Sequence, residues 1–215
     1  MTYVNFIENK INCYKIGEPI YTSDLAESLA EAFQLSRKEA AAAVSVAIKR
    51  LKDNKTISNL RFFQKGIYYK TKETPFGETG INKDVLITDK YLSGDNGYET
   101  GFALLHHMGL TTQIPVERVL VTNRATNCTR HDKVLDVFIS PPKVRVSSEN
   151  KYYLQVLDAI DIMNKAPIDA ERPFHTLADH IQTIGLDYRE LLALADKYYS
   201  KNTVLKLAQI AGERE

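Results

Sequence analysis

The sequence predicts an α+β protein of two domains whose C-terminal end is helical. Three observations lead to this fold class. Residues 1–72 alternate helical apolar spacing with short β-branched and aromatic runs, a polar stretch with Pro75 and Gly77 follows, and the later residues again mix helical and extended patterns. We therefore predict a first domain over 1–72, a linker over 73–82 and a second domain over 83–215, within a chain of 215 residues.

The first domain is expected to begin with a helix, a short strand and a second helix. Apolar residues recur at helical spacing over 3–14, and Gly17 and Pro19 then end that helix. Residues 19–21 favour a short extended segment. Thr22 is the predicted N-cap of the second helix, whose buried stripe comprises Leu25, Ala26, Leu29 and Phe33. We expect a tight turn after it, at Gln34–Leu35.

A third helix is predicted to start directly after Ser36. The segment Ser36-Arg37-Lys38-Glu39 is a capping box, in which the serine caps the helix and the glutamate reaches back to the serine N–H. A single apolar stripe follows, over Ala40, Ala43, Val44, Ala47, Ile48 and Leu51. The opposite face carries small and basic side chains, namely Lys38, Ala42, Ser45, Lys49 and Lys52.

The pattern changes from a helical to an extended one after Asn54. Residues 57–70 are rich in β-branched and aromatic residues and contain a turn at Gln64–Gly66, which predicts a β-hairpin. Helix, short strand, helix, tight turn, helix and basic hairpin is the order of a winged helix-turn-helix. In such a domain the third helix enters the major groove of DNA and the hairpin forms the wing.

The second domain is predicted to mix helices and strands before a helical tail. A Gly-rich turn at 94–97 separates two expected helices, over 84–92 and 99–107. Extended segments are expected over 116–122, 133–139 and 143–146. The remaining expected elements are helices over 149–164, 173–184, 187–199 and 202–211.

Charge is distributed unevenly along the chain. The formal net charge is +1, yet residues 1–72 carry twelve basic and seven acidic residues, and segment 36–72 alone has a net charge of +8. A basic surface of this kind favours a polyanionic partner, and here we predict double-stranded DNA. The predicted contact residues are Ser36, Arg37, Lys38, Ala42, Ser45, Lys49, Arg50 and Lys52 in the third helix, with Arg61 and Lys65 in the wing.

No motif of catalysis or cofactor binding stands out in the sequence. Residues 94–97 lack the lysine of a phosphate-binding loop, and no Gly-x-Ser-x-Gly elbow occurs. Cys128 and His131 form only half of a metal site, and His175 and His180 are not spaced for one helix face. We therefore expect no enzyme, no cofactor and no metal. The alternative is a metal-dependent nuclease, and its candidate residues are His131, Asp132, Asp136, Lys143, Asp158 and Asp161.

Three motifs give the sequence a resemblance to a known family. They are Phe63–Lys70, which ends the wing with Gly-Ile-Tyr-Tyr, Tyr98–Pro115, which contains Gly-Leu-Thr-Thr-Gln-Ile-Pro, and Val119–Asn123. In this combination the chain resembles the AbiEi-type antitoxins of bacterial type IV toxin–antitoxin systems, over about residues 20–165. We expect the middle motif to be mainly structural, with Phe102, Leu104, Leu105 and Leu110 buried against the strand at Val119–Val121.

The resemblance implies a fold and a function. It implies an N-terminal winged helix that represses the protein's own operon by binding repeats in the promoter. It also implies a C-terminal α+β domain tied to neutralising a cognate nucleotidyltransferase toxin. The DNA-contacting helix of the family corresponds to Ser36–Lys52 here and its wing to Leu60–Lys70. The family implies no catalytic residues.

Further expectations concern location and partners. No apolar run approaches the ~20 residues of a membrane helix, and the N-terminus lacks the features of a signal peptide. We therefore expect a cytoplasmic protein without a membrane partner. Repeated DNA sites favour a homodimer on DNA. The competing hypothesis is a protein-interaction module that inhibits a partner without binding DNA specifically.

Overall fold

The chain is an α+β protein whose C-terminal part is helical, as predicted. The computed structural model describes residues 1–213, and the side chain of Asn164 lies outside what it describes. The chain divides into two compact units, Met1–Leu86 and Ile87–Glu215. Within the described residues, no helix has the length and apolar character needed to cross a membrane.

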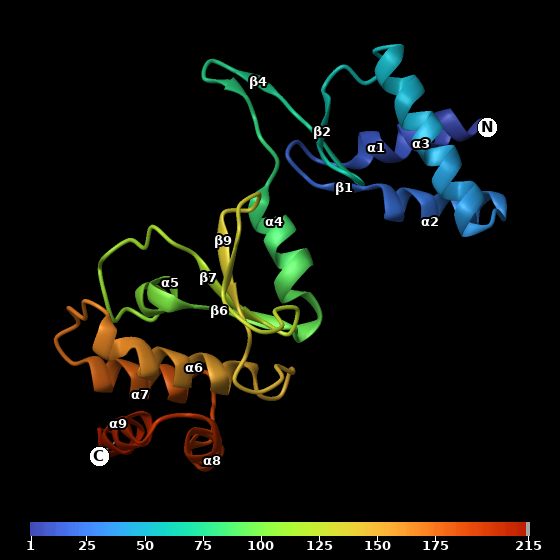
Figure 1. Cartoon of the computed structure of the whole chain (residues 1–215). Coiled ribbons are helices and arrows are strands. Elements are labelled where there is room, and N and C mark those ends of the chain that lie inside the picture. Colours follow the sequence, from blue (N-terminus) through green and yellow to red (C-terminus); the bar gives the residue numbers. More distant parts are fainter. Residues whose placement is uncertain (214–215) are drawn as a thin grey trace. The chain divides into compact units, whose positions relative to one another are not determined.

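Unit 1 is built on three long helices and a small antiparallel sheet, and it also includes a second short hairpin and most of α4 (Lys83–Ile87) (Figure 1). Its elements follow the predicted order: α1 (Tyr3–Cys13), β1 (Ile20–Tyr21), α2 (Thr22–Phe33), α3 (Arg37–Asp53), β2 (Leu60–Gln64) and β3 (Ile67–Lys70). The strands lie in the order β1-β3-β2, so the strand that precedes α2 pairs with the second strand of the hairpin. The sheet therefore ties the hairpin to the helices.

The start of α2 differs from the prediction. The helix begins at Thr22 itself, and its N-cap is Tyr21, which makes no side-chain capping bond. Tyr21 is held in β1 opposite Ile67, and the Thr22 N–H donates to the Gly66 carbonyl over 2.9 Å. The hairpin turn therefore supplies an acceptor for the first N–H of α2, a group that a capping side chain does not usually serve.

The core of unit 1 lies between its three helices. Ile7 and Ile11 of α1 and Leu25 and Leu29 of α2 are fully buried there. The predicted stripe of α3 is confirmed at Ala40, Val44, Ala47, Ile48 and Leu51, with Ala43 half-buried beside them. Since α1 and α2 both pack on this stripe, the opposite face of α3 is left exposed.

The segment predicted as a linker has a structure of its own. Residues 73–82 contain a second hairpin, formed by β4 (Glu73–Thr74) and β5 (Gly77–Glu78). The Thr71 hydroxyl donates to the Thr79 carbonyl over 2.7 Å, which closes the base of this hairpin. Unit 1 therefore extends to Leu86, beyond the predicted boundary at residue 72.

Unit 2 is built on a four-stranded sheet with the order β6-β7-β9-β8. The chain enters it through α4 (Lys83–Ile87), a π-helical turn over Thr88–Leu92 and a short 3-10 turn. The strands and the first helix are β6 (Gly97–Thr100), α5 (Gly101–His107), β7 (Val119–Thr122), β8 (Arg130–Asp132) and β9 (Val137–Ser140). Strands β7 and β9 are parallel, and the two outer pairs are antiparallel.

Strand β6 was missed by the sequence analysis, which placed a helix over 99–107. The helix begins at Gly101 because Glu99 and Thr100 belong to β6. Only glycine fits at the first residue of β6: a Cβ on Gly97 would lie 2.5 Å from the Val121 carbonyl oxygen. The strand thus depends on a close approach to β7, which local sequence does not reveal.

Two further extended segments differ from their predictions. Residues 130–140 form a hairpin of two short strands rather than one strand over 133–139. Residues 143–146 belong to no strand. The Asn123 side chain instead bonds the backbone of Val146, donating to its carbonyl over 2.8 Å and accepting from its N–H over 2.9 Å. A side chain therefore takes the place of a neighbouring strand.

Four helices complete unit 2, close to their predicted positions. They are α6 (Lys151–Ile162), α7 (Pro173–Thr183), α8 (Tyr188–Tyr198) and α9 (Lys201–Gly212). Figure 1 shows α6 between the sheet and the pair α8 and α9, and it contacts β6 on one side and those helices on the other. The core of the predicted motif is confirmed at Leu104, Leu105 and Leu110, whereas Phe102 is exposed rather than buried.

Candidate nucleic-acid interface

The exposed face of α3 carries most of the predicted contact residues. The capping box is confirmed: the Ser36 N–H donates to Glu39 Oε2 over 3.0 Å, and the Glu39 N–H donates to Ser36 Oγ over 3.3 Å. From this start the helix runs 17 residues. Its exposed predicted residues are Arg37, Lys38, Ala42, Ser45, Lys49, Arg50 and Lys52, and Asp53 closes the face at the C-terminal end.

The cations of this face have no partner within the described residues. No ion pair or hydrogen bond joins the side chains of Arg37, Lys38, Lys49, Arg50 or Lys52 to another described residue. Exposed lysines and arginines of this kind keep their full charge for an external anion. The helix α3 therefore carries five cations that form no ion pair among the described residues, with Asp53 as the acid near Lys49 and Arg50.

Both predicted serine contacts are engaged inside the molecule. The Ser36 hydroxyl donates to Glu39 Oε2 over 2.7 Å as part of the capping box. The Ser45 hydroxyl donates to the Ala41 carbonyl, one turn back, over 3.0 Å. These two hydroxyl protons are used in local hydrogen bonds, so the two serines retain only acceptor capacity for an external group.

Arg61 in β2 is also engaged. Its guanidinium makes a two-point ion pair with Glu78 of β5, in which Nε donates to Oε2 over 2.9 Å and Nη2 donates to Oε1. A third donor, Nη1, reaches the Ser58 carbonyl over 2.8 Å. Arg61 thus joins the two hairpins of unit 1, and its charge is compensated where the sequence predicted a free cation.

Lys65 occupies the turn between β2 and β3. The turn residue Gly66 has a φ of +83° and accepts the Thr22 N–H, which places the turn against the first residue of α2. Lys65 is exposed, and no ion pair or hydrogen bond of its side chain is found among the described residues. The predicted wing therefore offers one uncompensated cation rather than two.

One residue of the exposed face was missed by the sequence analysis. Val46 is 50% exposed and lies one helical turn after Ala42. The predicted buried stripe and the predicted exposed face both omit it. Its position supplied the signal, because Val46 falls outside the apolar stripe of α3 and next to the predicted basic face.

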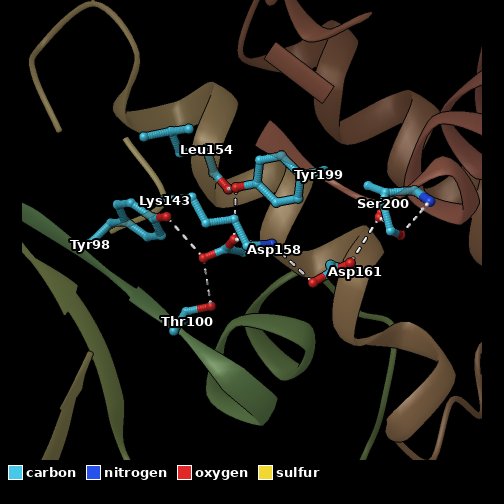
Figure 2. A network of polar contacts seen from close by, with 9 residues as sticks. Tyr98, Thr100, Lys143, Leu154, Asp158, Asp161, Tyr199 and Ser200 are labelled. Atoms are coloured by element: carbon cyan, nitrogen blue, oxygen red, sulfur yellow. Dashed lines mark hydrogen bonds and ion pairs between the residues drawn. The ribbon is translucent and has the colours of Figure 1, made fainter. Parts of the chain in front are cut away.

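The candidate residues of the nuclease alternative lie at two places in unit 2. At the first, Asp158 of α6 is 12% exposed and accepts three hydroxyl groups (Figure 2). Tyr98 and Thr100 of β6 donate to its Oδ2 over 2.9 and 3.4 Å, and Tyr199 donates to its Oδ1 over 2.8 Å. Burial raises the pKa of Asp158, against the hydrogen bonds from Tyr199 and Tyr98.

Lys143 and Asp161 extend this network. The Lys143 ammonium lies 3.0 Å from Asp161 Oδ2, 4.0 Å from Asp158 Oδ1 and 3.6 Å from the centre of the Tyr199 ring. Thr203 of α9 donates to Asp161 Oδ1 over 2.8 Å. Although burial acts to raise the pKa of Asp161, the hydrogen bonds from Lys143 and Thr203 lower it overall. The network connects β6, α6, α9 and the residue between α8 and α9.

The second place is the β8–β9 hairpin. Asp132 accepts from Lys90 Nζ and from the Tyr91 hydroxyl, each over 2.7 Å. Burial acts to raise the pKa of Asp132, yet these bonds lower it to about 2. Asp136 lies 2.9 Å from His131 Nε2. Among the described residues, no group of three or more His, Cys, Asp or Glu side chains is arranged to hold a metal ion.

Unit 2 also has an apolar groove beside α5 and β7. Its volume is about 430 Å³, and it is lined mainly by apolar residues of the middle motif. Ile114 and Val116 are 82% and 101% exposed, and Phe102 is exposed beside them. The polar members of the lining are Thr111, Gln113 and Glu117. The middle motif, predicted to be mainly structural, therefore also carries an exposed apolar surface.

Comparison with known proteins places the chain in no family. No family model and no curated protein matches the sequence. Among solved structures, the chain is similar to the crystal structure of the RV2827C protein from Mycobacterium tuberculosis, with a TM-score of 0.47 and 11% sequence identity, over 99% of this chain and 77% of that one. Likeness at this level establishes neither a shared family nor a shared function.

Proposed function

We propose that this chain is a DNA-binding transcriptional autorepressor and the antitoxin of a type IV toxin–antitoxin system. In this proposal unit 1 is a winged helix-turn-helix that binds repeated sites in its own promoter. Unit 2 counteracts a nucleotidyltransferase toxin, and the protein acts in the cytoplasm. The autoregulatory and antitoxin roles rest on the sequence resemblance, and the DNA-binding role also rests on the geometry of unit 1.

The observation that carries the DNA-binding proposal is the row of uncompensated cations on α3. A solvated helix face commonly pairs its lysines with carboxylates three or four residues away. In α3 only Asp53 lies at this spacing, from Lys49 and Arg50, and no ion pair joins it to either of them among the described residues. The β1-β3-β2 sheet, which joins the hairpin to the start of α2, supports the same assignment.

A mobility shift on the DNA upstream of the gene tests this function. The purified protein is titrated over a salt series against that fragment and against an unrelated fragment of equal length. We expect tighter binding to the upstream fragment, with an affinity that falls steeply as salt rises. Equal or absent binding to both fragments would remove the autorepressor role and leave the partner-binding alternative.

The Arg61–Glu78 ion pair gives a prediction of increased affinity. In Glu78→Gln, Arg61 loses its charged partner and becomes available to a phosphate. We expect tighter DNA binding and a salt dependence steeper by up to about 0.9 in log–log slope. Glu73→Gln is the matched control, because it changes the charge of the same hairpin by the same amount without touching Arg61. Equal effects of the two variants would show that net charge alone is responsible.

A second candidate function is binding of a protein partner by unit 2, and the exposed apolar groove favours it. In the double variant Ile114→Glu and Val116→Glu, two carboxylates would enter that surface, and both positions are exposed enough to leave the core intact. We expect loss of toxin neutralisation in cells that carry the adjacent toxin gene, with promoter binding unchanged. Retained neutralisation would exclude the groove from that function.

A further inference from the structure

The middle of the exposed face of α3 is apolar. Val46 is half exposed, and Ala42, also exposed, lies one turn before it. The one hydroxyl among these residues belongs to Ser45, and it donates to the Ala41 carbonyl. The surface between the cations therefore carries the methyl groups of Ala42 and Val46 beside the Ser45 hydroxyl oxygen, and it has no side-chain donor available.

The composition of α3 limits what this surface can recognise. The helix contains no asparagine, glutamine or histidine, and its two arginines, Arg37 and Arg50, lie near its ends. Adenine and guanine are read in the major groove mainly by paired hydrogen bonds from Asn, Gln, Arg or Lys. Thymine instead presents a C5-methyl group, which is read by apolar contact. Of the base edges in the major groove, the thymine methyl therefore matches the middle of α3 best.

The cations on either side of this apolar patch indicate what kind of molecule would contact it. Lys38 lies four residues before Ala42, and Lys49 lies three residues after Val46, without a carboxylate partner among the described residues. They are eleven positions apart, which is about 16 Å along a helix. This separation suits phosphates on the two sides of a major groove about 12 Å wide. A single exposed valine is ordinary, but one placed between two such cations complements an apolar group within a polyanion.

We infer that Val46, together with Ala42, contacts the C5-methyl group of thymine in the major groove and contributes sequence specificity there. The inference rests on the proposed DNA-binding function and adds the chemistry of the base that is read. Lys38 and Lys49 position the helix through phosphates, and Val46 selects the base. Burial of one methyl group is worth about fourfold in affinity.

The experiment replaces thymine by deoxyuridine, which removes only the methyl group. The bound site is first mapped by footprinting on the upstream DNA, and each thymine in it is then substituted singly. We expect about fourfold weaker binding of the wild type at one or two thymines of each half-site. Val46→Ala should bind the thymine site about fourfold less tightly and should show little further loss on deoxyuridine. Ile16→Ala, an exposed aliphatic residue of unit 1 away from α3, is the matched control and should behave as wild type.

The outcomes separate this inference from the proposed function. Specific binding without any loss on deoxyuridine, or with the same loss in Val46→Ala as in wild type, would overturn the thymine contact and leave DNA binding intact. Absence of specific binding to any DNA would overturn both. Since Val46 lies outside the core, circular dichroism should show the same helix content in the variant as in wild type.

Discussion

Replacement of Lys38 and Lys49 by alanine is expected to weaken binding to the promoter roughly 30-fold at near-physiological salt, because each charge-assisted contact contributes about 1 kcal/mol or more. Removal of two phosphate contacts should also reduce the log–log salt slope by about 1.8. Alanine favours helix, so α3 should form as in wild type. The measurement is the mobility shift over a salt series, repeated with the double variant.

The control removes two positive charges from elsewhere in the chain. Lys197 and Lys201 are exposed residues of α8 and α9, and their replacement by alanine changes the net charge equally. If DNA binding depends on the α3 face, this variant should keep nearly the full affinity and slope. A loss as large as that of the α3 variant would mean that binding reflects the overall charge of the protein, and the assignment of α3 as the contact helix would be wrong.

The features of unit 1 that sequence could predict are local ones. The capping box from Ser36 to Glu39 lies within four residues, and the apolar stripe of α3 repeats within single helical turns. Helix propensity and hydrophobic periodicity depend on residues within a few positions of one another. They therefore determine where α3 begins and which of its faces is buried. The exposed face follows as the complement of the buried one, which is why most predicted contact residues lie on it.

The features that sequence could not predict depend on distant partners. Arg61 and Glu78 are 17 positions apart, and nothing near either residue indicates that they pair. Strand β6 forms because Gly97 allows a close approach to Val121, and α2 begins at Thr22 beside the hairpin turn, where the Gly66 carbonyl accepts the Thr22 N–H. In each case a contact made through the tertiary fold overrides the local preference.

The Asp158 network joins residues that lie especially far apart in the sequence. Tyr98, Thr100, Lys143 and Tyr199 meet around one carboxylate, although they span about a hundred positions of the chain. Asp158 and Asp161 are among the carboxylates that the sequence predicts for the nuclease alternative. The structure instead surrounds Asp158 with hydroxyl donors from the sheet and from the chain after α8, which indicates a role in holding unit 2 together.

Replacement of Asp158 by alanine is therefore expected to destabilise unit 2 by about 3 kcal/mol or more. The variant leaves the buried hydroxyl of Tyr98 without its acceptor and leaves that of Tyr199 with the Leu154 carbonyl at 3.3 Å. Asp161 then remains as the only carboxylate partner of Lys143 among the described residues. A loss of this size is a large fraction of the free energy of unfolding of a domain, which is usually about 5–15 kcal/mol. It should lower the melting temperature by about 10 °C. Calorimetry of the full chain, which can resolve unit 2 from unit 1, measures it. Asp196→Ala, at an exposed position of α8, is the control and should change stability by no more than about 0.5 kcal/mol.

The pH dependence of this loss tests its cause. Since burial raises the pKa of Asp158 in the folded state above its ordinary value of 3.8, the folded protein holds that proton more tightly than the unfolded chain. The contribution of Asp158 to the free energy of unfolding therefore increases as pH falls from neutral through the raised pKa. The same contribution decreases as pH rises. Asp158→Ala lacks this titration, so the stability difference between wild type and variant should be larger near pH 4 than at pH 7.

Asp132 and Asp161 have lowered pKa values, so acidification removes their contribution to stability in both proteins. The comparison of the two proteins largely removes this effect. A difference that shrinks as pH falls would mean that the folded state favours the ionised carboxylate, and that the hydrogen bonds from Tyr199 and Tyr98 together with the charge of Lys143 outweigh the effect of burial.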